Sequence, residues 1–166
     1  MKVGFIGIGT MGGHMALNVR AKGYEVIVND IRRELAAPHL KAGATWADSA
    51  RKVAEAADVV FTSLPGPKEV QAVAEELLAG MRKGTAWFDL STNSPTVVRQ
   101  ISERFAARGI AMLDSPVSGG PSGAKSGKLA LWVSGDQATF DKHKAVLDAI
   151  GDQAVYIGPV GAGTVA

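Results

Sequence analysis

The stretch Lys2-Val-Gly-Phe-Ile-Gly-Ile-Gly-Thr-Met-Gly12 decides the fold, because an apolar run stops there at a glycine turn and a helical pattern begins. Its glycines Gly7, Gly9 and Gly12 have the G-x-G-x-x-G spacing. The first permits a tight turn, the second lets a pyrophosphate approach the backbone, and the third lets helix and strand pack closely. Backbone N–H groups at the helix start, with the helix dipole behind them, attract an anion. The stretch therefore predicts a phosphate-binding loop.

The composition is that of an ordinary globular chain. The 166 residues are 46% hydrophobic and 20% charged, which suffices for one well-buried domain and argues against a disordered or fibrous protein. The formal net charge is +2, and the basic residues form no block of the kind that binds nucleic acid or a membrane surface. No apolar run reaches the roughly 20 residues that span a bilayer. We therefore expect neither nucleic acid nor a membrane as a partner.

The sequence contains no cysteine. This excludes disulfides and thiolate chemistry and fits a reducing compartment, so we expect a cytoplasmic protein. Glycines interrupt the apolar run near the N-terminus, which disfavours a signal peptide. The histidines His14, His39 and His143 are far apart in the sequence, so we expect surface or packing roles for them and no metal site.

Strand-like and helix-like segments alternate along the chain. The strand-like apolar runs are residues 3–8, 25–29, 58–64, 85–90, 110–113, 129–134 and 154–157. The helix-like segments are residues 11–22, 33–42, 48–56, 67–78, 94–107 and 137–150. This alternation is typical of an α/β fold with a doubly wound, mostly parallel sheet and helices on both faces. Because no internal repeat or linker interrupts it, we expect one domain over residues 1–166.

Asp30 follows the glycine loop by about 20 residues, at the end of the next apolar run. In a dinucleotide-binding unit, an acidic residue at this place accepts hydrogen bonds from the adenosine ribose and repels a 2′-phosphate. The loop and the carboxylate together predict a Rossmann-type site that prefers NAD, although NADP stays possible because Arg32 and Arg33 lie nearby. The alternative is that Asp30 only begins the turn after the strand.

Three further loops follow predicted strands. Ligands of open α/β sheets bind outside the carboxyl ends of the strands, so we expect Ser63-Leu-Pro-Gly-Pro67 and Asp89-Leu-Ser-Thr-Asn-Ser-Pro95 to line a crevice. A turn with a helix cap would explain the prolines but not Ser91 and Thr92. The glycine-rich residues 114–127 offer backbone N–H groups to a carboxylate or form a flexible, hairpin-like connector, and spacing favours neither interpretation.

Four ordered motifs make the sequence resemble a known family. They are Gly4-Phe-Ile-Gly-Ile-Gly-Thr-Met-Gly-Gly-His-Met-Ala-Leu-Asn18, Leu64-Pro65, Asp89-Leu-Ser-Thr92 and Ser115-Pro-Val-Ser-Gly-Gly120. Together they resemble the β-hydroxyacid dehydrogenases, which include 3-hydroxyisobutyrate dehydrogenase and the tartronate semialdehyde, glyoxylate and succinic semialdehyde reductases. 6-Phosphogluconate dehydrogenase is also similar. Its Gly-Gly-Asn-Ser pattern is missing from the segment after Asp89, which disfavours a sugar-phosphate substrate.

The resemblance implies roles for individual residues. Those that it assigns to the cofactor are Gly7, Ile8, Gly9, Thr10, Met11, Gly12, Asn18, Asp30, Leu64, Pro65 and Thr92. Those that it assigns to the substrate carboxylate are Ser118, Gly119 and Gly120. The implied reaction is reversible hydride transfer between a small β-hydroxy acid and NAD(P), with a lysine as general acid and base.

The implied lysine follows a Gly-x-Gly-x-x-x pattern in the family, and Gly161-Ala-Gly-Thr-Val-Ala166 matches that pattern at the end of this sequence. We therefore expect no catalytic residue within 1–166 and a lysine directly after Ala166. The resemblance also implies a following all-helical domain, absent from this sequence, that makes the parent protein a homo-oligomer. Lys125 and Lys128 are alternative bases, but loop charges in solvent explain them better. The rival function is a non-catalytic nucleotide-binding or oligomeric interaction module.

Overall fold

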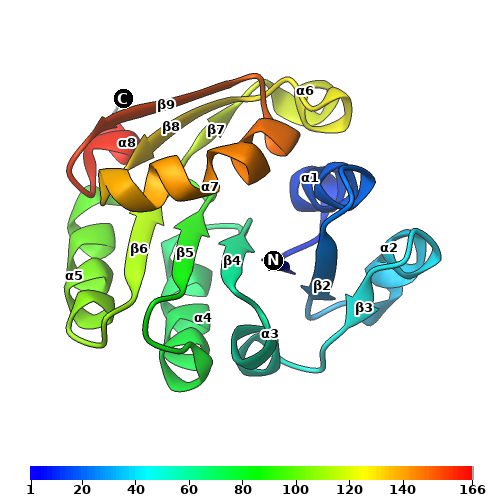
Figure 1. The fold of residues 1–166 in the computed structure, drawn as a ribbon, viewed down its shortest axis with the longest axis horizontal. Coiled ribbons are helices and arrows are strands. Elements are labelled where there is room, and N and C mark those ends of the chain that lie inside the picture. Colours follow the sequence, from blue (N-terminus) through cyan, green and yellow to red (C-terminus); the bar gives the residue numbers. More distant parts are fainter. Residues whose placement is uncertain (166) are drawn as a thin grey trace.

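The computed structural model describes residues 1–165, and its strands form one mixed sheet (Figure 1). They are β1 (Lys2–Ile6), β2 (Glu25–Asn29), β3 (Thr45–Trp46), β4 (Val59–Thr62), β5 (Ala86–Asp89), β6 (Ala111–Asp114), β7 (Val117–Ser118), β8 (Ala130–Ser134) and β9 (Gln153–Gly158). The order in the sheet is β3-β2-β1-β4-β5-β6-β8-β7, and β9 pairs with β8. All pairs from β3 to β6 are parallel, which confirms the predicted mostly parallel sheet. The strand order reverses between β1 and β4.

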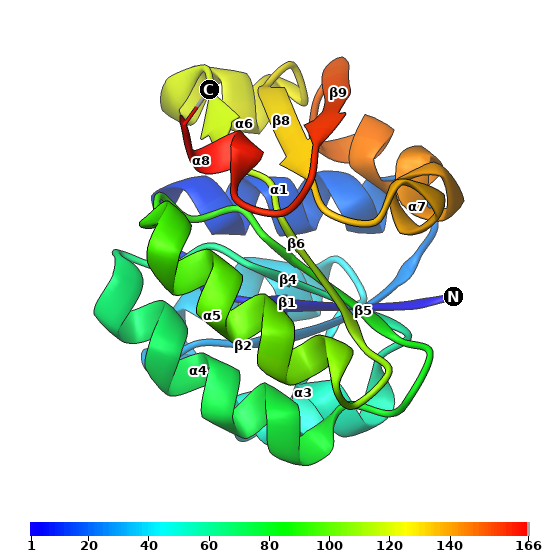
Figure 2. The same cartoon turned by 90° about the vertical axis from the view of Figure 1, so that its left-hand side faces the viewer.

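Helices cover both faces of the sheet. They are α1 (Thr10–Ala21), the 3-10 helix η1 (Arg33–Ala36), α2 (Ala37–Lys41), α3 (Ala50–Ala56), α4 (Pro67–Gly80), α5 (Pro95–Ala106), α6 (Gly120–Ser126), α7 (Gln137–Ile150) and α8 (Ala162–Val165). Helices α1, α6 and α7 lie on one face, and α3, α4 and α5 lie on the other (Figure 2). None of the helices in this part of the chain is both long and apolar enough to cross a membrane.

A separate hydrophobic core fills each face of the sheet. On the side of α1 and α7, the rings of Phe5, Phe61 and Phe88 stack across β1, β4 and β5 with centroids 5.9 and 5.2 Å apart. On the other side, Trp87 packs against Phe105 of α5, with ring centroids 5.0 Å apart. Full burial of each large apolar side chain contributes about 1.5–3 kcal/mol. Burial on both faces is why the strands are nearly continuous apolar runs.

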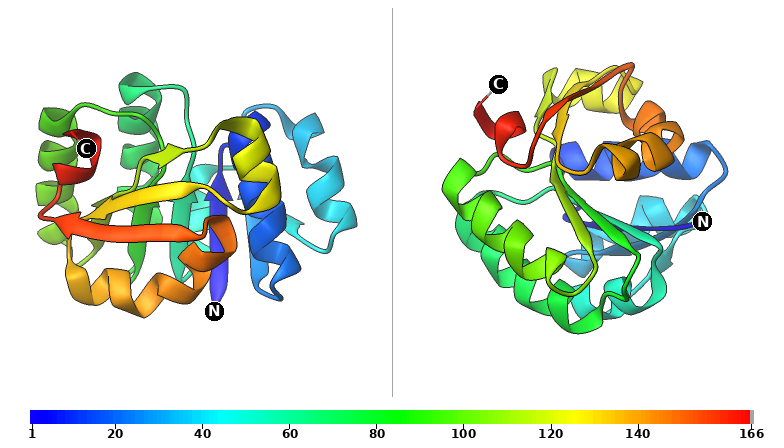
Figure 3. Two further views of the ribbon diagram at one scale, coloured as in Figure 1. Left: turned by 90° about the horizontal axis from the view of Figure 1, so that it is seen from above. Right: turned by 60° about the vertical axis from the view of Figure 1, so that its left-hand side comes forward.

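The structure differs from the sequence-based expectation in its shortest elements. Strands β3 and β7 contain two residues each, too few for a recognisable apolar run. The helix expected over residues 33–42 is divided into η1 and α2, with Pro38 in the first turn of α2. Residues 114–127 were expected to be a loop under either interpretation, but they contain α6, which begins at Gly120 with Pro121 in its first turn. The connection from β7 through α6 returns to β8, which lies beside β9 at this end of the sheet (Figure 3).

The histidines pack as expected. His39 of α2 is buried, with Nε2 2.9 Å from the carbonyl oxygen of Gly13. His143 of α7 is also buried, with Nδ1 2.8 Å from the Thr139 carbonyl oxygen, and burial lowers its pKa. His14 is half-buried on α1. Between residues 1 and 165, no three His, Cys, Asp or Glu side chains are grouped so that they could hold a metal ion.

Candidate functional site

A cleft of about 500 Å³ lies where the strand order reverses, at the carboxyl ends of β1, β2 and β4. We call it the carboxyl-edge cleft. Its walls come from the glycine loop, the end of β2, the loop after β4 and one face of α4. The residues that line it include Gly7, Gly9, Thr10, Met11, Gly12, Asp30, Ile31, Arg32, Leu64, Pro65, Glu69, Val73 and Glu76. A crevice at the switch point of a parallel sheet is where such folds bind ligands.

The three loop glycines have different surroundings. Gly7 has φ +89°, and a Cβ atom there would overlap the carbonyl group of Ser63. A Cβ atom at Gly12 would overlap the carbonyl group of Gly7, so both positions need glycine for the fold itself. A Cβ atom at Gly9 would meet no described atom within 4 Å. The space over Gly9 therefore opens into the cleft and is not required by packing.

Helix α1 begins directly beside that space. Its N-cap residue is Gly9, and no side chain caps the helix. The first backbone N–H groups of a helix lack intrahelical partners and carry the positive end of the helix dipole. A ligand phosphate over Gly9 would receive these hydrogen bonds without displacing a side chain.

The carboxylate of Asp30 joins the end of β2 to the glycine loop. Its Oδ2 accepts a hydrogen bond from the backbone N–H of Ile8 at 2.8 Å, and its Oδ1 accepts one from that of Arg32 at 2.9 Å. Each carboxylate oxygen can accept more than one hydrogen bond, so both can still receive ligand hydroxyls. Asp30 thus holds a fixed orientation at the edge of the cleft.

The two neighbouring arginines are each paired with a carboxylate. Nε of Arg32 lies 3.1 Å from Oε1 of Glu34. Nη1 of Arg33 lies 3.5 Å from Oδ1 of Asp48, and its guanidinium lies 5.1 Å from the ring centroid of Trp46. These pairs are largely exposed, and they place acidic groups beside both cations.

A buried row of polar side chains crosses the sheet next to the cleft. It consists of Thr62, Asp89, Asp114 and Ser134, the last residues of β4, β5, β6 and β8. Neighbours in this row are register partners. All four side chains are buried, and burial raises the pKa of the Asp89 carboxyl group above its ordinary value. We call this set the polar row.

The structure brings eight of the eleven predicted cofactor residues together in the cleft. They are Gly7, Gly9, Thr10, Met11, Gly12, Asp30, Leu64 and Pro65. Ile8 has a buried side chain and contributes only its N–H group, to Asp30. Asn18 lies further along α1, where its Nδ2 donates to the carbonyl oxygen of Ala124 at 2.7 Å. Thr92 is exposed in the loop after β5, outside the lining of the cleft.

The residues assigned to the substrate carboxylate lie outside this cleft. Ser118 ends β7, and Gly119 and Gly120 lead into α6 with φ of +135° and +62°. All three are exposed. Lys125 and Lys128, the alternative bases, are exposed near the end of α6.

Sequence reasoning missed the cleft wall that α4 provides. Glu69, Val73 and Glu76 face the cleft together, and their spacing of four and three residues places them on one side of a helix. That spacing could have predicted from the sequence that these three side chains lie on the same side of α4. Ile31, two residues beyond the end of β2, was also missed, and its side chain is completely exposed at the rim of the cleft.

Comparison with known proteins shows which family the chain belongs to. A family model described as the NAD binding domain of 6-phosphogluconate dehydrogenase matches residues 2–158. The chain belongs to this NAD-binding family. The match confirms the predicted relationship and the predicted type of cofactor.

The relatives of this NAD-binding domain include dehydrogenases. The NAD-dependent L-serine dehydrogenase of Pseudomonas aeruginosa is 39% identical over 99% of the chain and 56% of its own length. The 3-hydroxyisobutyrate dehydrogenase of Mycobacterium tuberculosis, solved with L-serine, has a TM-score of 0.95 and 33% identity over 99% of the chain and 56% of that structure. Psf3, solved with NADP+ and 2-OPP, has a TM-score of 0.93 and 32% identity over 98% of the chain and 59% of that structure.

The chain spans about half the length of the curated relatives that it matches. The matched half is their cofactor domain. The chain is therefore an NAD(P)-binding domain of the β-hydroxyacid dehydrogenase type.

Proposed function

We propose that residues 1–166 are the cofactor-binding half of an oxidoreductase that transfers a hydride between NAD and a small β-hydroxy acid. The observation that carries this proposal is the space over Gly9, beside an uncapped helix start in the carboxyl-edge cleft. A phosphate group suits this place because its negative charge is attracted by the helix start and because no side chain fills the space over Gly9. The nicotinamide of the bound cofactor would accept or supply the hydride.

Each wall of the cleft would hold a different part of the cofactor. The start of α1 at Thr10 and Met11 would bind the pyrophosphate through backbone N–H groups. Asp30 would accept hydrogen bonds from the adenosine ribose. The apolar side chains of Leu64, Pro65 and Val73 would contact the adenosine. Thr92, after β5, would meet the cofactor further along the carboxyl edge.

The preference for NAD over NADP rests on charge. Asp30 is fixed by two backbone hydrogen bonds and would repel a 2′-phosphate. Arg32 is paired with Glu34 and Arg33 with Asp48, so neither cation is free of a neighbouring acid. Glu69 and Glu76 add further acidic groups to the cleft lining.

The substrate half of the proposal rests on the relatives and on the exposed loop at Ser118, Gly119 and Gly120. Backbone N–H groups of such a glycine-rich loop suit a carboxylate. The general acid and base would be a lysine directly after Ala166, so residues 1–166 alone would bind cofactor with little turnover. In the parent protein we expect a cytoplasmic homo-oligomer acting on an acid of the size of 3-hydroxyisobutyrate or serine.

Calorimetric titration of residues 1–166 with NAD+ tests the cofactor half. We expect saturable binding, weakened about tenfold or more by Gly9→Ala, since a methyl group in a fitted contact costs about 1–3 kcal/mol. Ala21→Val, which adds bulk at an exposed position near the other end of α1, is the control and should bind like wild type. Absence of NAD+ binding at millimolar concentration would refute the proposal.

The coding sequence beyond Ala166 separates the enzyme from a non-catalytic module. A lysine codon followed by a long helical region supports the enzyme. Any other residue there favours the sensor or interaction platform.

A further inference from the structure

Asp89 is a completely buried carboxylate whose hydrogen bonds all come from uncharged groups. Its relative exposure is 0%, and among the ion pairs of the described residues none involves it. Burying an ionisable group without a counter-ion is costly, and the raised pKa of Asp89 is the sign of that cost.

Donors reach Asp89 from strand β4 and from the loop after β5. Oγ1 of Thr62 donates a hydrogen bond to Oδ1 of Asp89 at 2.8 Å. The Thr62 Oγ1 also accepts a hydrogen bond from Nε1 of Trp87 at 2.9 Å, which directs the Thr62 hydroxyl proton toward the carboxylate. The backbone N–H of Ser91 donates to Oδ1 at 3.1 Å. Nδ2 of Asn93 donates to Oδ2 at 3.4 Å. Only a carboxylate offers two acceptor oxygens and no competing donor at this place.

The network extends from Asp89 to the wall of the carboxyl-edge cleft. Oγ of Ser91 accepts a hydrogen bond from the backbone N–H of Leu64 at 2.8 Å. Leu64 lines the cleft, while Ser91 is buried behind it. The position of the Leu64 backbone therefore depends on Ser91, and the position of Ser91 depends on Asp89.

We propose that Asp89 is a positioning residue for the carboxyl-edge cleft, which orders residues 91–93 and, through Ser91, sets the cleft wall at Leu64 before a ligand binds. The inference rests on the proposed function in one respect, that the ligand is a dinucleotide. Asp89 touches no ligand itself. Its hydrogen bonds order the cleft wall in the free protein, so the entropic cost of ordering that wall is not subtracted from the free energy of binding.

Asp114 provides a matched comparison within the polar row. It is the register partner of Asp89 and equally buried. Its Oδ1 accepts from Oγ of Ser134 and from the backbone N–H of Gly161 at 2.9 Å, so these contacts face β8 and the start of α8. The hydrogen bonds of Asp89 lead through Ser91 to Leu64, whereas those given above for Asp114 lead to Ser134 and Gly161.

The experiment compares three variants of residues 1–166 by NAD+ titration and by hydrogen exchange of the Leu64 amide without ligand. Asp89→Asn places an NH2 group opposite that of Asn93 and should weaken NAD+ binding about tenfold and speed Leu64 exchange. The double variant Asp89→Asn/Asn93→Asp swaps the amide and the carboxylate, so every donor again has an acceptor. It should restore the affinity for NAD+ to within about twofold of wild type. Asp114→Asn should leave both measurements unchanged.

Three results would overturn the inference: wild-type affinity in Asp89→Asn, no recovery in the double variant, or equal weakening by Asp114→Asn. If Asp89→Asn does not fold, Ser91→Ala breaks the same connection at the Leu64 N–H, and unchanged exchange there would contradict the inference. If the wild-type chain does not bind NAD+, the proposed function fails, and Leu64 exchange still decides whether Asp89 orders the cleft wall.

Discussion

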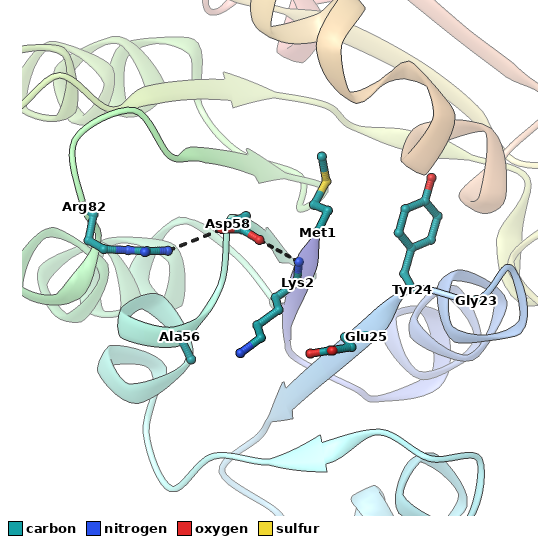
Figure 4. A pocket seen from close by; sticks show the side chains of 8 residues that line it. All are labelled: Met1, Lys2, Gly23, Tyr24, Glu25, Ala56, Asp58 and Arg82. Carbon is teal, nitrogen blue, oxygen red and sulfur yellow. Dashed lines mark hydrogen bonds and ion pairs between the residues drawn. The ribbon is translucent and has the colours of Figure 1, made fainter.

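In the part of the chain that the structure describes, one cleft of about 500 Å³ lies at each edge of the parallel strands, and the two linings differ in kind. The cleft at the amino edge is lined by Met1, Lys2, Gly23, Tyr24, Glu25, Ala56, Asp58 and Arg82 (Figure 4). There Asp58 accepts a hydrogen bond from the Lys2 backbone N–H at 2.7 Å and pairs with Arg82 at 3.5 Å. Two of its charged side chains, Asp58 and Arg82, are thus engaged with one another. In the carboxyl-edge cleft, the start of α1 faces open space over Gly9.

The difference follows from the direction of the chain. In a parallel sheet, each crossover helix starts near the carboxyl end of one strand and ends near the amino end of the next. Helices α1 and α4 therefore begin, at Thr10 and Pro67, at the carboxyl edge. Partly positive N–H groups collect there, and carbonyl groups collect at the amino edge. Two clefts of equal volume are thus unequal toward an anion.

Gly12→Ala should have the largest effect, because a Cβ atom there overlaps the Gly7 carbonyl group. We expect a loss of stability of about 3 kcal/mol, the upper range for overpacking, together with loss of NAD+ binding. Urea unfolding followed by circular dichroism measures the change. Gly9→Ala is the matched control, and it should lose binding with little loss of stability. Equal destabilisation by both substitutions would refute the division between packing and ligand glycines.

Asp30→Asn should have the next largest effect. The amide oxygen can still accept from Ile8, but the negative charge is lost. We expect weaker NAD+ binding and stronger NADP+ binding, with a shift in their affinity ratio of about tenfold. Titration with each nucleotide measures the ratio. Asp58→Asn removes a charge from the amino-edge cleft and should leave the ratio unchanged, and an equal shift there would mean that only net charge matters.

The pH dependence of stability should differ between the two edges. Burial raises the pKa of the Asp89 carboxyl group above its ordinary value of 3.8. Between 3.8 and the raised pKa, the folded state binds more protons than the unfolded state, so the free energy of unfolding falls as pH rises through the raised pKa. Asp89→Asn should remove this decline. The hydrogen bond from the Lys2 N–H lowers the pKa of Asp58, so its stabilisation is present above 3.8 and is lost as pH falls. Thermal unfolding from pH 3 to 8, over about the range in which carboxyl groups titrate, checks both slopes.

Arg82→Ala should have the smallest effect. The pair with Asp58 is about half exposed, and such surface pairs contribute about 0–1 kcal/mol. NAD+ affinity should equal that of wild type, because Arg82 lines the amino-edge cleft and not the carboxyl-edge cleft, where we propose that the cofactor binds. A measurable loss of affinity would mean that the two clefts are coupled through the sheet.

The dinucleotide-binding unit at the N-terminus could be predicted because its parts lie close together in the sequence. The glycine loop, α1 and Asp30 lie within 30 residues, and each has a recognisable physical reason. The roles that the sequence could not predict depend on contacts between distant residues. The hydrogen bond from Asn18 to the carbonyl oxygen of Ala124 joins residues 106 positions apart, so the sequence did not show it; the role of Asn18 toward the cofactor stays a prediction. The polar row exists only through strand register, which a single sequence does not display.

The short strands β3 and β7 and the helix α6 were not predicted for a different reason. Strands β3 and β7 have two residues each, and α6 is rich in glycine, so neither periodicity nor propensity marks them. Tertiary packing decides these segments. Asn18 bonds to the last turn of α6, and Gly127 in the left-handed region ends that helix.

Trp87 gives the polar row an optical reporter. It is the completely buried tryptophan of the chain, whereas Trp46 and Trp132 are partly exposed. Its indole N–H donates to Thr62, which in turn donates to Asp89, so its emission depends on the bond pattern at the carboxyl edge. Fluorescence of a Trp46→Phe/Trp132→Phe variant would therefore follow the state of the Asp89 network in real time, from inside the protein and without a label.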